Sequence, residues 1–389
     1  MSTRPSLFFL FKAFFTVGAS SFGGYAALVA VVQRILVERH KTIEDDTIVK
    51  GFSIASFLPG PVAVNTVTYI GYSLAGWSGA FVSMFAVILP SMILMMIFAA
   101  LYETYGTLPE ISSFLAAVIP VVMALILSVA FNMGKKNMKS IKHYLILVIV
   151  LSLQLLFHGY WTFILSFFVG GGLGYLFFNE PAAPATEGSK VHFKKSHMVI
   201  ALFLVCTVLL NFIELPWDNI NLNLATVFSG ISLSLFGGGY VMIPMLNDII
   251  VLQKGWLSNI EFLDAIALGQ VTPGPILISA TFIGYKLNGI WGAIIATIGI
   301  FLPSGILMVL VADSLKKIDQ NPVWRAIFEG LKPVIIALML SSIIILGKSV
   351  EDWWLSGIIV VVSAILIIRY QVNFLWLIGA AGLLGIFLI

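Results

Sequence analysis

Long apolar stretches dominate the chain and restrict what it can fold into. Of its 389 residues, 60% are hydrophobic and 10% are charged, whereas ordinary soluble proteins carry about 25% charged residues. An α-helix needs about 20 apolar residues to cross the ~30 Å hydrocarbon core of a bilayer. The sequence therefore predicts an all-α polytopic membrane protein, with uninterrupted membrane helices at 77–102, 110–132, 141–158, 159–178, 197–213, 290–312, 323–347, 353–368 and 372–389.

Four further apolar stretches are interrupted near their middle by glycine or proline. Each arm of about 12–15 residues would reach about 20 Å, enough to touch the membrane midplane but not to cross the core. We therefore interpret each stretch as a broken, re-entrant hairpin that enters and leaves on one side; two complete crossings are the alternative. The interrupted stretches are 7–36 (at Phe22-Gly23-Gly24), 44–76 (at Leu58-Pro59-Gly60-Pro61), 222–250 (at Phe236-Gly237-Gly238-Gly239) and 260–288 (at Pro273-Gly274-Pro275).

Short motifs recur in the same order in the two halves of the chain. FLPGP at 57–61 returns as VTPGP at 271–275, and ILPSMILM at 88–95 returns as FLPSGILM at 301–308. The spacing is 214 residues for the first pair and 213 for the second, which is too constant for chance. We predict an N-terminal repeat at 1–178, a cytoplasmic linker plus an extra transmembrane helix at 179–214, and a C-terminal repeat at 215–389.

The placement of lysine and arginine predicts the orientation of the helices, because short cytoplasmic loops are enriched in these residues. The lysine-rich loop 135–142 is predicted inside, and the connection 103–110, which has no lysine or arginine, is predicted outside. In the second half, the basic loop 316–325 matches 103–110 and is predicted inside. The repeats are therefore predicted to be inverted through helix 197–213, with the N-terminus in the cytoplasm and the C-terminus outside.

The broken helices predict a binding site for a small oxyanion near the midplane. Non-helical backbone at this depth occurs only where protein or a water-filled cavity surrounds it, and paired interruptions in inverted repeats point to transporter substrate sites. Pro61 and Pro275 are predicted to start half-helices, and the glycines permit positive φ and close approach to a ligand. Four half-helix N-termini would offer unpaired N–H groups and positive dipole ends to the anion. A packing role for the glycines is the alternative.

The interruption motifs and the polar residues near them form the predicted substrate-binding set. Lys50 and Asp264, each nine residues before a Pro-Gly-Pro motif, are candidates for coupling or gating, and solvation at the hairpin mouths is the alternative. The predicted substrate-binding residues are Phe22, Gly23, Gly24, Pro59, Gly60, Pro61, Asn65, Phe236, Gly237, Gly238, Gly239, Gln270, Thr272, Pro273, Gly274, Pro275 and Ser279, with Ser53, Ser56, Thr66 and Thr281 as further polar neighbours.

Composition argues against several other classes of function. The formal net charge of +3 is too small to form a nucleic-acid-binding surface. The single cysteine, Cys206, excludes an internal disulfide and a cysteine-based metal cluster. No nucleophile–base pair or intramembrane carboxylate pair supports an enzyme. The histidines fall in predicted loops or at helix ends, so we interpret them as solvated and predict no metal and no cofactor; they are His40, His143, His158, His192 and His197.

As a group, Phe22-Gly23-Gly24, Leu58-Pro59-Gly60-Pro61, Ile70-Gly71-Tyr72 and Leu89-Pro90, repeated in the second half, resemble the chromate ion transporter family. The resemblance covers nearly the whole chain and matches the long, duplicated form of that family. It implies a bacterial inner-membrane protein that carries chromate, with sulfate as the close structural analogue. It also implies transport that is usually outward and that gives chromate resistance.

The leading hypothesis is a secondary transporter that moves a tetrahedral dianion, chromate or sulfate, by alternating access. The membrane potential favours anion export by about 2.3 kcal/mol per charge per 100 mV, so a uniporter suffices for efflux. Coupled proton exchange through Asp264 or Glu261 is a second route. An anion channel built on the same helix dipoles is the alternative function. The predicted partners are the oxyanion and the lipid bilayer, and a homodimer is one possible assembly.

Overall fold

A computed structural model describes residues 5–22, 25–106, 108–157, 159–179, 219–235, 239–311, 322–348, 350 and 352–388. Over these residues the regular elements are all helices. Six of them are long and apolar enough to cross a membrane, or seven if one bent pair counts as a single span. The predicted all-α polytopic membrane architecture is therefore confirmed. The predicted helix 197–213 and Cys206 lie outside the described residues.

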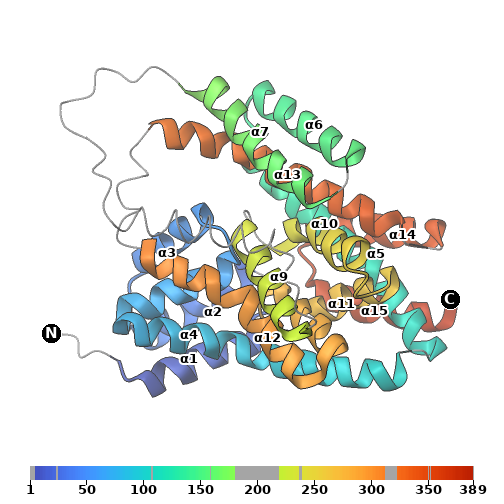
Figure 1. The fold of residues 1–389 in the computed structure, drawn as a ribbon, viewed down its shortest axis with the longest axis horizontal. Helices are drawn as coiled ribbons and strands as arrows, with labels where there is room; N and C mark the ends of the chain where they lie inside the picture. Colours follow the sequence, from blue (N-terminus) through green and yellow to red (C-terminus); the bar gives the residue numbers. More distant parts are fainter. Residues whose placement is uncertain are drawn as a thin grey trace.

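The helices of the two halves follow one another in the same order (Figure 1). The first half contains α1 (Leu7–Ser20), α2 (Tyr25–Val32), the π-helical η1 (Gln33–Arg39), α3 (Asp45–Phe57), α4 (Val62–Tyr105), α5 (Pro109–Asn137), α6 (Ile141–Leu156) and α7 (Tyr160–Phe178). The second contains α9 (Ile220–Ser234), the 3-10 turn η2 (Gly239–Val241), α10 (Met242–Leu246), the π-helical η3 (Asn247–Gln253), α11 (Asn259–Val271), the 3-10 turn η4 (Ile276–Ile278), α12 (Ser279–Val311), α13 (Pro322–Lys348), α14 (Trp353–Tyr370) and α15 (Phe374–Leu388).

The uninterrupted stretches read from the sequence correspond to the later helices of each half. Both α5 and α13 contain a proline, at Pro120 and Pro333, which lie 213 residues apart. Two of the predicted spans are short: α6 has 16 residues and α15 has 15. At 1.5 Å per residue these two helices reach about 24 and 22 Å, less than the ~30 Å core.

In each half, the Pro-Gly-Pro turn joins two helices that fold back on each other. A methyl group added to Gly51 of α3 would lie 2.8 Å from Cδ1 of Tyr69 and 3.5 Å from Thr66, both on α4. In the second half, a methyl group added to Gly269 of α11 would lie 3.6 Å from Cβ of Ser279. Residues ten apart in a continuous helix are separated by about 15 Å. Both turns are therefore the tips of helical hairpins.

A second reversal divides α4 and α12. At Gly76 the backbone leaves the helical region with φ +65°, and a methyl group added to Gly71 would lie 2.4 Å from the carbonyl oxygen of Gly79. The arm before the break therefore lies against the arm after it, and α12 reverses in the same way at 288–289. This reversal coincides with the predicted boundary between the stretches 44–76 and 77–102.

The last helices of each half pack against the other half. Helix α7 lies along α13 (Figure 1), where a methyl group added to Gly174 would lie 2.7 Å from Cα of Gly330. Helix α15 packs against α5, and a methyl group added to Gly382 would meet the ring of Phe114 at 2.2 Å. Small residues at these crossings let the helices approach closely, as is common in membrane proteins. The two halves are thus interlocked.

Candidate functional site

The first Pro-Gly-Pro turn is held by residues of the second half. Gly60 has φ +110°, a conformation that L-amino acids rarely adopt, and its N–H donates to the carbonyl oxygen of Leu235 at 2.6 Å. A methyl group added to Gly60 would lie 2.1 Å from Cβ of Ser304 and 2.9 Å from Nδ2 of Asn65. Only glycine fits this turn, because the end of α9 and the last third of α12 enclose it.

The second Pro-Gly-Pro turn is held in the same way by residues of the first half. Gly274 has φ +97°, and its N–H donates to the carbonyl oxygen of Ser21, at the end of α1, at 2.7 Å. A methyl group added to Gly274 would lie 2.9 Å from Oγ of Ser91 on α4. Each turn therefore contacts the end of the first helix and the serine of the Leu-Pro-Ser motif in the opposite half.

The starts of the half-helices differ from the sequence prediction by one residue. Pro61 and Pro275 have extended ψ values of 104° and 136°, so each precedes the first helical residue instead of occupying it. The Gly60 and Gly274 N–H groups donate to protein carbonyls and are not available to a ligand. The donors that remain beside the turns include the first-turn N–H groups of α4, which have no acceptor within the helix.

Three buried side chains beside the turns carry polar atoms without a hydrogen-bond partner among the described residues. They are Oδ1 of Asn65, Oγ of Ser279 and Nε2 of Gln270, and the three residues are 0%, 1% and 4% exposed. Nδ2 of Asn65 donates to the Pro59 carbonyl at 3.2 Å, and Oε1 of Gln270 accepts from the Tyr240 hydroxyl at 3.5 Å. Asn65 and Ser279 each stand four residues after the second proline of their motif, so the arrangement recurs in both halves.

The other polar residues predicted near the site are either hydrogen-bonded within the protein or exposed. Thr66 and Thr272 are buried, and each hydroxyl donates to a backbone carbonyl of its own helix. Thr281 pairs with Thr297 at 2.7 Å. Ser53 and Ser56 are exposed. The three threonine hydroxyls therefore already have hydrogen-bond partners.

The Phe-Gly-Gly motifs are described only in part. Phe22 follows Ser21 and is partly buried, whereas Gly23, Gly24, Phe236, Gly237 and Gly238 lie outside the described residues. Gly239 begins η2 without a positive φ. Glycine at this position allows η2 to pack closely against Ile276, because a methyl group there would lie 3.2 Å from Cβ of Ile276.

Ser91 and Ser304 lie beside the two turns and were not among the predicted substrate-binding residues. Both follow the proline of the repeated Leu-Pro-Ser motif, at 90–91 and 303–304. The repetition was visible in the sequence, but nothing in it indicated that each serine faces the turn of the opposite half.

Lys50 and Asp264 occupy matched sequence positions in different environments. Lys50 is exposed and pairs with Asp46, one helical turn earlier. Asp264 is 5% exposed and accepts a hydrogen bond from the Tyr102 hydroxyl at 2.6 Å. The geometry of Lys50 fits the solvated alternative, and that of Asp264 fits a role in coupling or gating.

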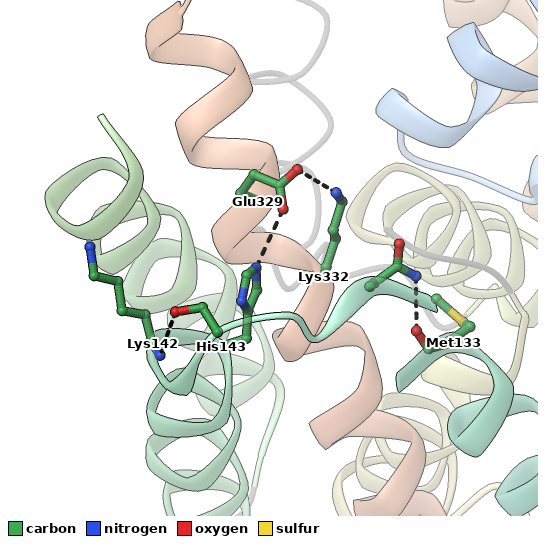
Figure 2. A network of polar contacts seen from close by, with 7 residues as sticks. Met133, Lys142, His143, Glu329 and Lys332 are labelled. Atoms are coloured by element: carbon green, nitrogen blue, oxygen red, sulfur yellow. Dashed lines mark hydrogen bonds and ion pairs between the residues drawn. The ribbon is translucent and has the colours of Figure 1, made fainter. Parts of the chain in front are cut away.

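The structure corrects the interpretation of His143 as solvated. His143 is 5% exposed, and Nε2 lies 3.4 Å from Oε2 of Glu329 on α13 (Figure 2). Lys332 binds the other oxygen of Glu329 at 2.5 Å, and Phe178 packs against the imidazole ring. The start of α6 is covered by a helix of the other half, which sequence position alone did not reveal.

Several membrane-crossing helices, broken at buried polar turns where two interlocked halves meet, define this molecule as an integral membrane transport protein. The chain belongs to the chromate transporter family, whose sequence model matches residues 8–175 and 222–386. The family resemblance predicted from the motifs is therefore confirmed.

Individual relatives agree with this assignment. The chain is 28% identical to an uncharacterized transporter of Methanocaldococcus jannaschii over 385 residues, which is 98% of this chain and 94% of the relative. It is 27% identical to the chromate transport protein of Cupriavidus metallidurans over 378 residues, or 96% and 91% of the two chains. The uncharacterized transporter YwrA of Bacillus subtilis is 30% identical over 154 residues, 39% of this chain but 86% of the relative. No solved structure matches the chain.

Proposed function

We propose that this protein is a secondary transporter that carries a tetrahedral oxyanion, chromate with sulfate as its analogue, out of the cell. The observation that carries the proposal is the pair of buried donors beside the second turn, Nε2 of Gln270 and Oγ of Ser279, which have no partner among the described residues; the unpartnered atom of Asn65 is an acceptor and suits a water molecule. Such atoms nearly always meet a partner in native proteins, so they indicate a place that holds a polar ligand or water. Relatives named chromate transport protein, 27% and 26% identical, suggest which anion it is.

Neutral donors suit an anion that must be bound and released in every cycle. Gln270 offers an amide N–H, Ser279 offers a hydroxyl, and the first turn of α4 offers backbone N–H groups at the positive end of a helix dipole. In the described part of the chain, no lysine or arginine hydrogen-bonds to either turn. The site therefore attracts a dianion without holding it through an ion pair.

We further propose that the halves are inverted repeats that open on opposite sides of the membrane. The first hairpin has its tip at the Pro-Gly-Pro turn, and its open end, the mouth, lies at residues 75–76. The segment 77–105 begins at that mouth and leads away from it. Near the far end of this arm, Tyr102 contacts Asp264 at 2.6 Å and the ring of Phe282 at 5.1 Å between centroids. Both partners belong to the second hairpin, which supports a mouth on the opposite side.

In alternating access, one half then rocks against the other around the two turns. The hydrogen bonds from Gly60 to Leu235 and from Gly274 to Ser21 join the halves at equivalent places, so the same contacts serve both orientations. The similar lengths of the two segments that match the family model support the duplication. In the inner membrane of a cell with a negative interior, a dianion leaves downhill by about 4.6 kcal/mol per 100 mV.

Counterflow in proteoliposomes tests this function. We expect chromate inside the vesicles to accelerate uptake of labelled chromate, sulfate to compete, and phosphate and chloride to have little effect. An anion channel is the second outcome that the assay distinguishes. It would give large conductance without acceleration by internal substrate, and would contradict the transporter.

The orientation of the C-terminus provides a separate prediction. In a Cys206→Ser background, a cysteine introduced at Ile389 is expected to react with a membrane-impermeant maleimide added outside intact cells. Lys136→Cys, in the basic loop predicted inside, is the matched control and should react only after the membrane is opened. Exclusive cytoplasmic labelling at Ile389 would contradict the inversion.

A further inference from the structure

A buried carboxylate joins the two halves away from the turns. Asp264, in the middle of α11, is 5% exposed, and its recorded hydrogen bond comes from the hydroxyl of Tyr102, 2.6 Å from Oδ2. Tyr102 belongs to α4 of the other half. A buried carboxylate is costly unless a cation, several donors or a proton compensates its charge.

No cation pairs with Asp264 in the described part of the chain. The lysine of this cluster, Lys286 on α12, instead pairs with Glu261 at 3.2 Å and lies 5.8 Å from the ring centre of Tyr102. Glu261 also accepts from the backbone N–H and the hydroxyl of Ser258 at 2.9 and 3.0 Å. Helices α5 and η3 also pack against α11, and none of their titratable groups (Glu110, Lys135, Lys136 and Asp248) hydrogen-bonds to Asp264 or pairs with it; Asp248 instead accepts from the Gly159 N–H at 2.9 Å. Glu261 and Lys286 neutralise each other, so Asp264 is left with the uncompensated charge.

We propose that Asp264 is a proton-binding site of the transporter and that Tyr102 positions its carboxyl group. Oxygen atoms from these two residues suffice for a proton, whereas a hard metal cation requires about six oxygen ligands. The matched residue of the first half, Lys50, is exposed and paired with Asp46. The proton site is therefore a feature of the second half, about midway along the first arm of its hairpin.

The proton site is linked to the candidate anion site by its position on the same helix. Asp264 and Gln270 are six residues apart on α11, about 9 Å along the helix axis. A carboxylate and an anion repel each other at this distance in a medium of low dielectric. A proton on Asp264 therefore favours anion binding, and by reciprocity a bound anion favours protonation. This linkage rests on the proposed oxyanion transport, whereas the proton site itself does not.

The linkage implies that a proton and an anion cross together. A dianion accompanied by one proton carries one net negative charge, so the membrane potential still drives it outward. A proton gradient directed into the cell opposes that movement. Efflux should therefore accelerate when this gradient is collapsed while the potential is maintained.

Infrared titration of the purified protein tests the proton site without any substrate. We expect a carbonyl band of a protonated carboxyl group that grows as the pH falls and is missing from Asp264→Asn. Glu261→Gln is the matched control and should retain the band, and Tyr102→Phe should retain it with a changed pH profile. Identical spectra for the wild type and Asp264→Asn across the titration would overturn the proposal.

Proton movement in proteoliposomes tests the coupling. With a pH-sensitive dye inside the vesicles, chromate movement by the wild type should carry protons in the same direction, and Asp264→Asn should lose that proton movement. Proton movement that persists in Asp264→Asn would refute the coupling. If the wild type moves no chromate, the proposed function fails, and the infrared result still decides the proton site.

Discussion

Gly60→Ala is expected to lower oxyanion counterflow by about 100-fold or more. The new methyl group would lie 2.1 Å from Cβ of Ser304, and φ at this residue is +110°. Overpacking costs about 1–3 kcal/mol and a strained backbone another 1–3 kcal/mol, while each 1.4 kcal/mol is a factor of ten. The substitution also displaces the N–H that donates to Leu235. Counterflow of labelled chromate measures the loss, and size-exclusion chromatography verifies that the variant is folded.

Matched glycines make the Gly60 prediction specific. Gly76 also has a positive φ, +65°, but a methyl group there meets no atom within 4 Å, so Gly76→Ala has the backbone cost without the overpacking cost and should lose roughly tenfold less activity than Gly60→Ala. Gly274→Ala should be intermediate, because its methyl group would lie 2.9 Å from Ser91. Adding Ser304→Gly to Gly60→Ala should restore part of the activity. Equal losses for Gly60→Ala and Gly76→Ala would remove the turn from the transport pathway.

Gln270→Glu is expected to reduce chromate binding and transport by about 100-fold or more. The side chain is 4% exposed, and its Nε2 has no hydrogen-bond partner among the described residues. The substitution keeps the shape of the side chain, removes a donor and places a second negative charge beside a dianion. A lost buried hydrogen bond to a charged group costs about 1.5–3 kcal/mol, and like charges at a shared site add to that cost. Chromate binding to the detergent-purified variant measures the effect.

Ser56→Glu is the matched control for Gln270→Glu. Ser56 stands three residues before Pro59, as Gln270 stands three before Pro273, but Ser56 is exposed. Ser56 offers no unpaired donor, because its hydroxyl donates to the Phe52 carbonyl at 2.8 Å, so the substitution should change chromate binding by less than about threefold. A Gln270→Glu variant that binds chromate like the wild type would exclude Gln270 from the site.

Much of the fold was predictable because its signals are local. A stretch of about 20 apolar residues indicates a membrane helix wherever it occurs, and glycine and proline interrupt helices for reasons confined to a few residues. The breaks at 58–61 and 272–275, and the boundary at 76, follow from such signals. The placement of Pro61 and Pro275 differed by one residue, because the extended backbone of the turn continues through the proline.

The candidate site was predictable only in outline. The motifs pointed to the two turns and to Asn65, Gln270 and Ser279, but the serines that face the turns went unassigned. The position of His143 at a helix end predicted a solvated side chain, but His143 packs against Glu329, 186 residues away in the sequence. Lys50 and Asp264 occupy equivalent sequence positions, but Lys50 is exposed and Asp264 is buried.

The sequence by itself determined that this is a multi-pass helical membrane protein of the chromate transporter family with breaks at defined glycines and prolines. Only the tertiary structure decided which atoms meet across the halves: the Gly60 amide with the Leu235 carbonyl, the Gly274 amide with Ser21, and Asp264 with Tyr102. Hydropathy and helix breaking depend on neighbours along the chain, whereas the burial and partners of a polar group depend on how helices from distant segments pack. Where those helices cross determines which amides donate to carbonyls and which polar groups are left for a ligand.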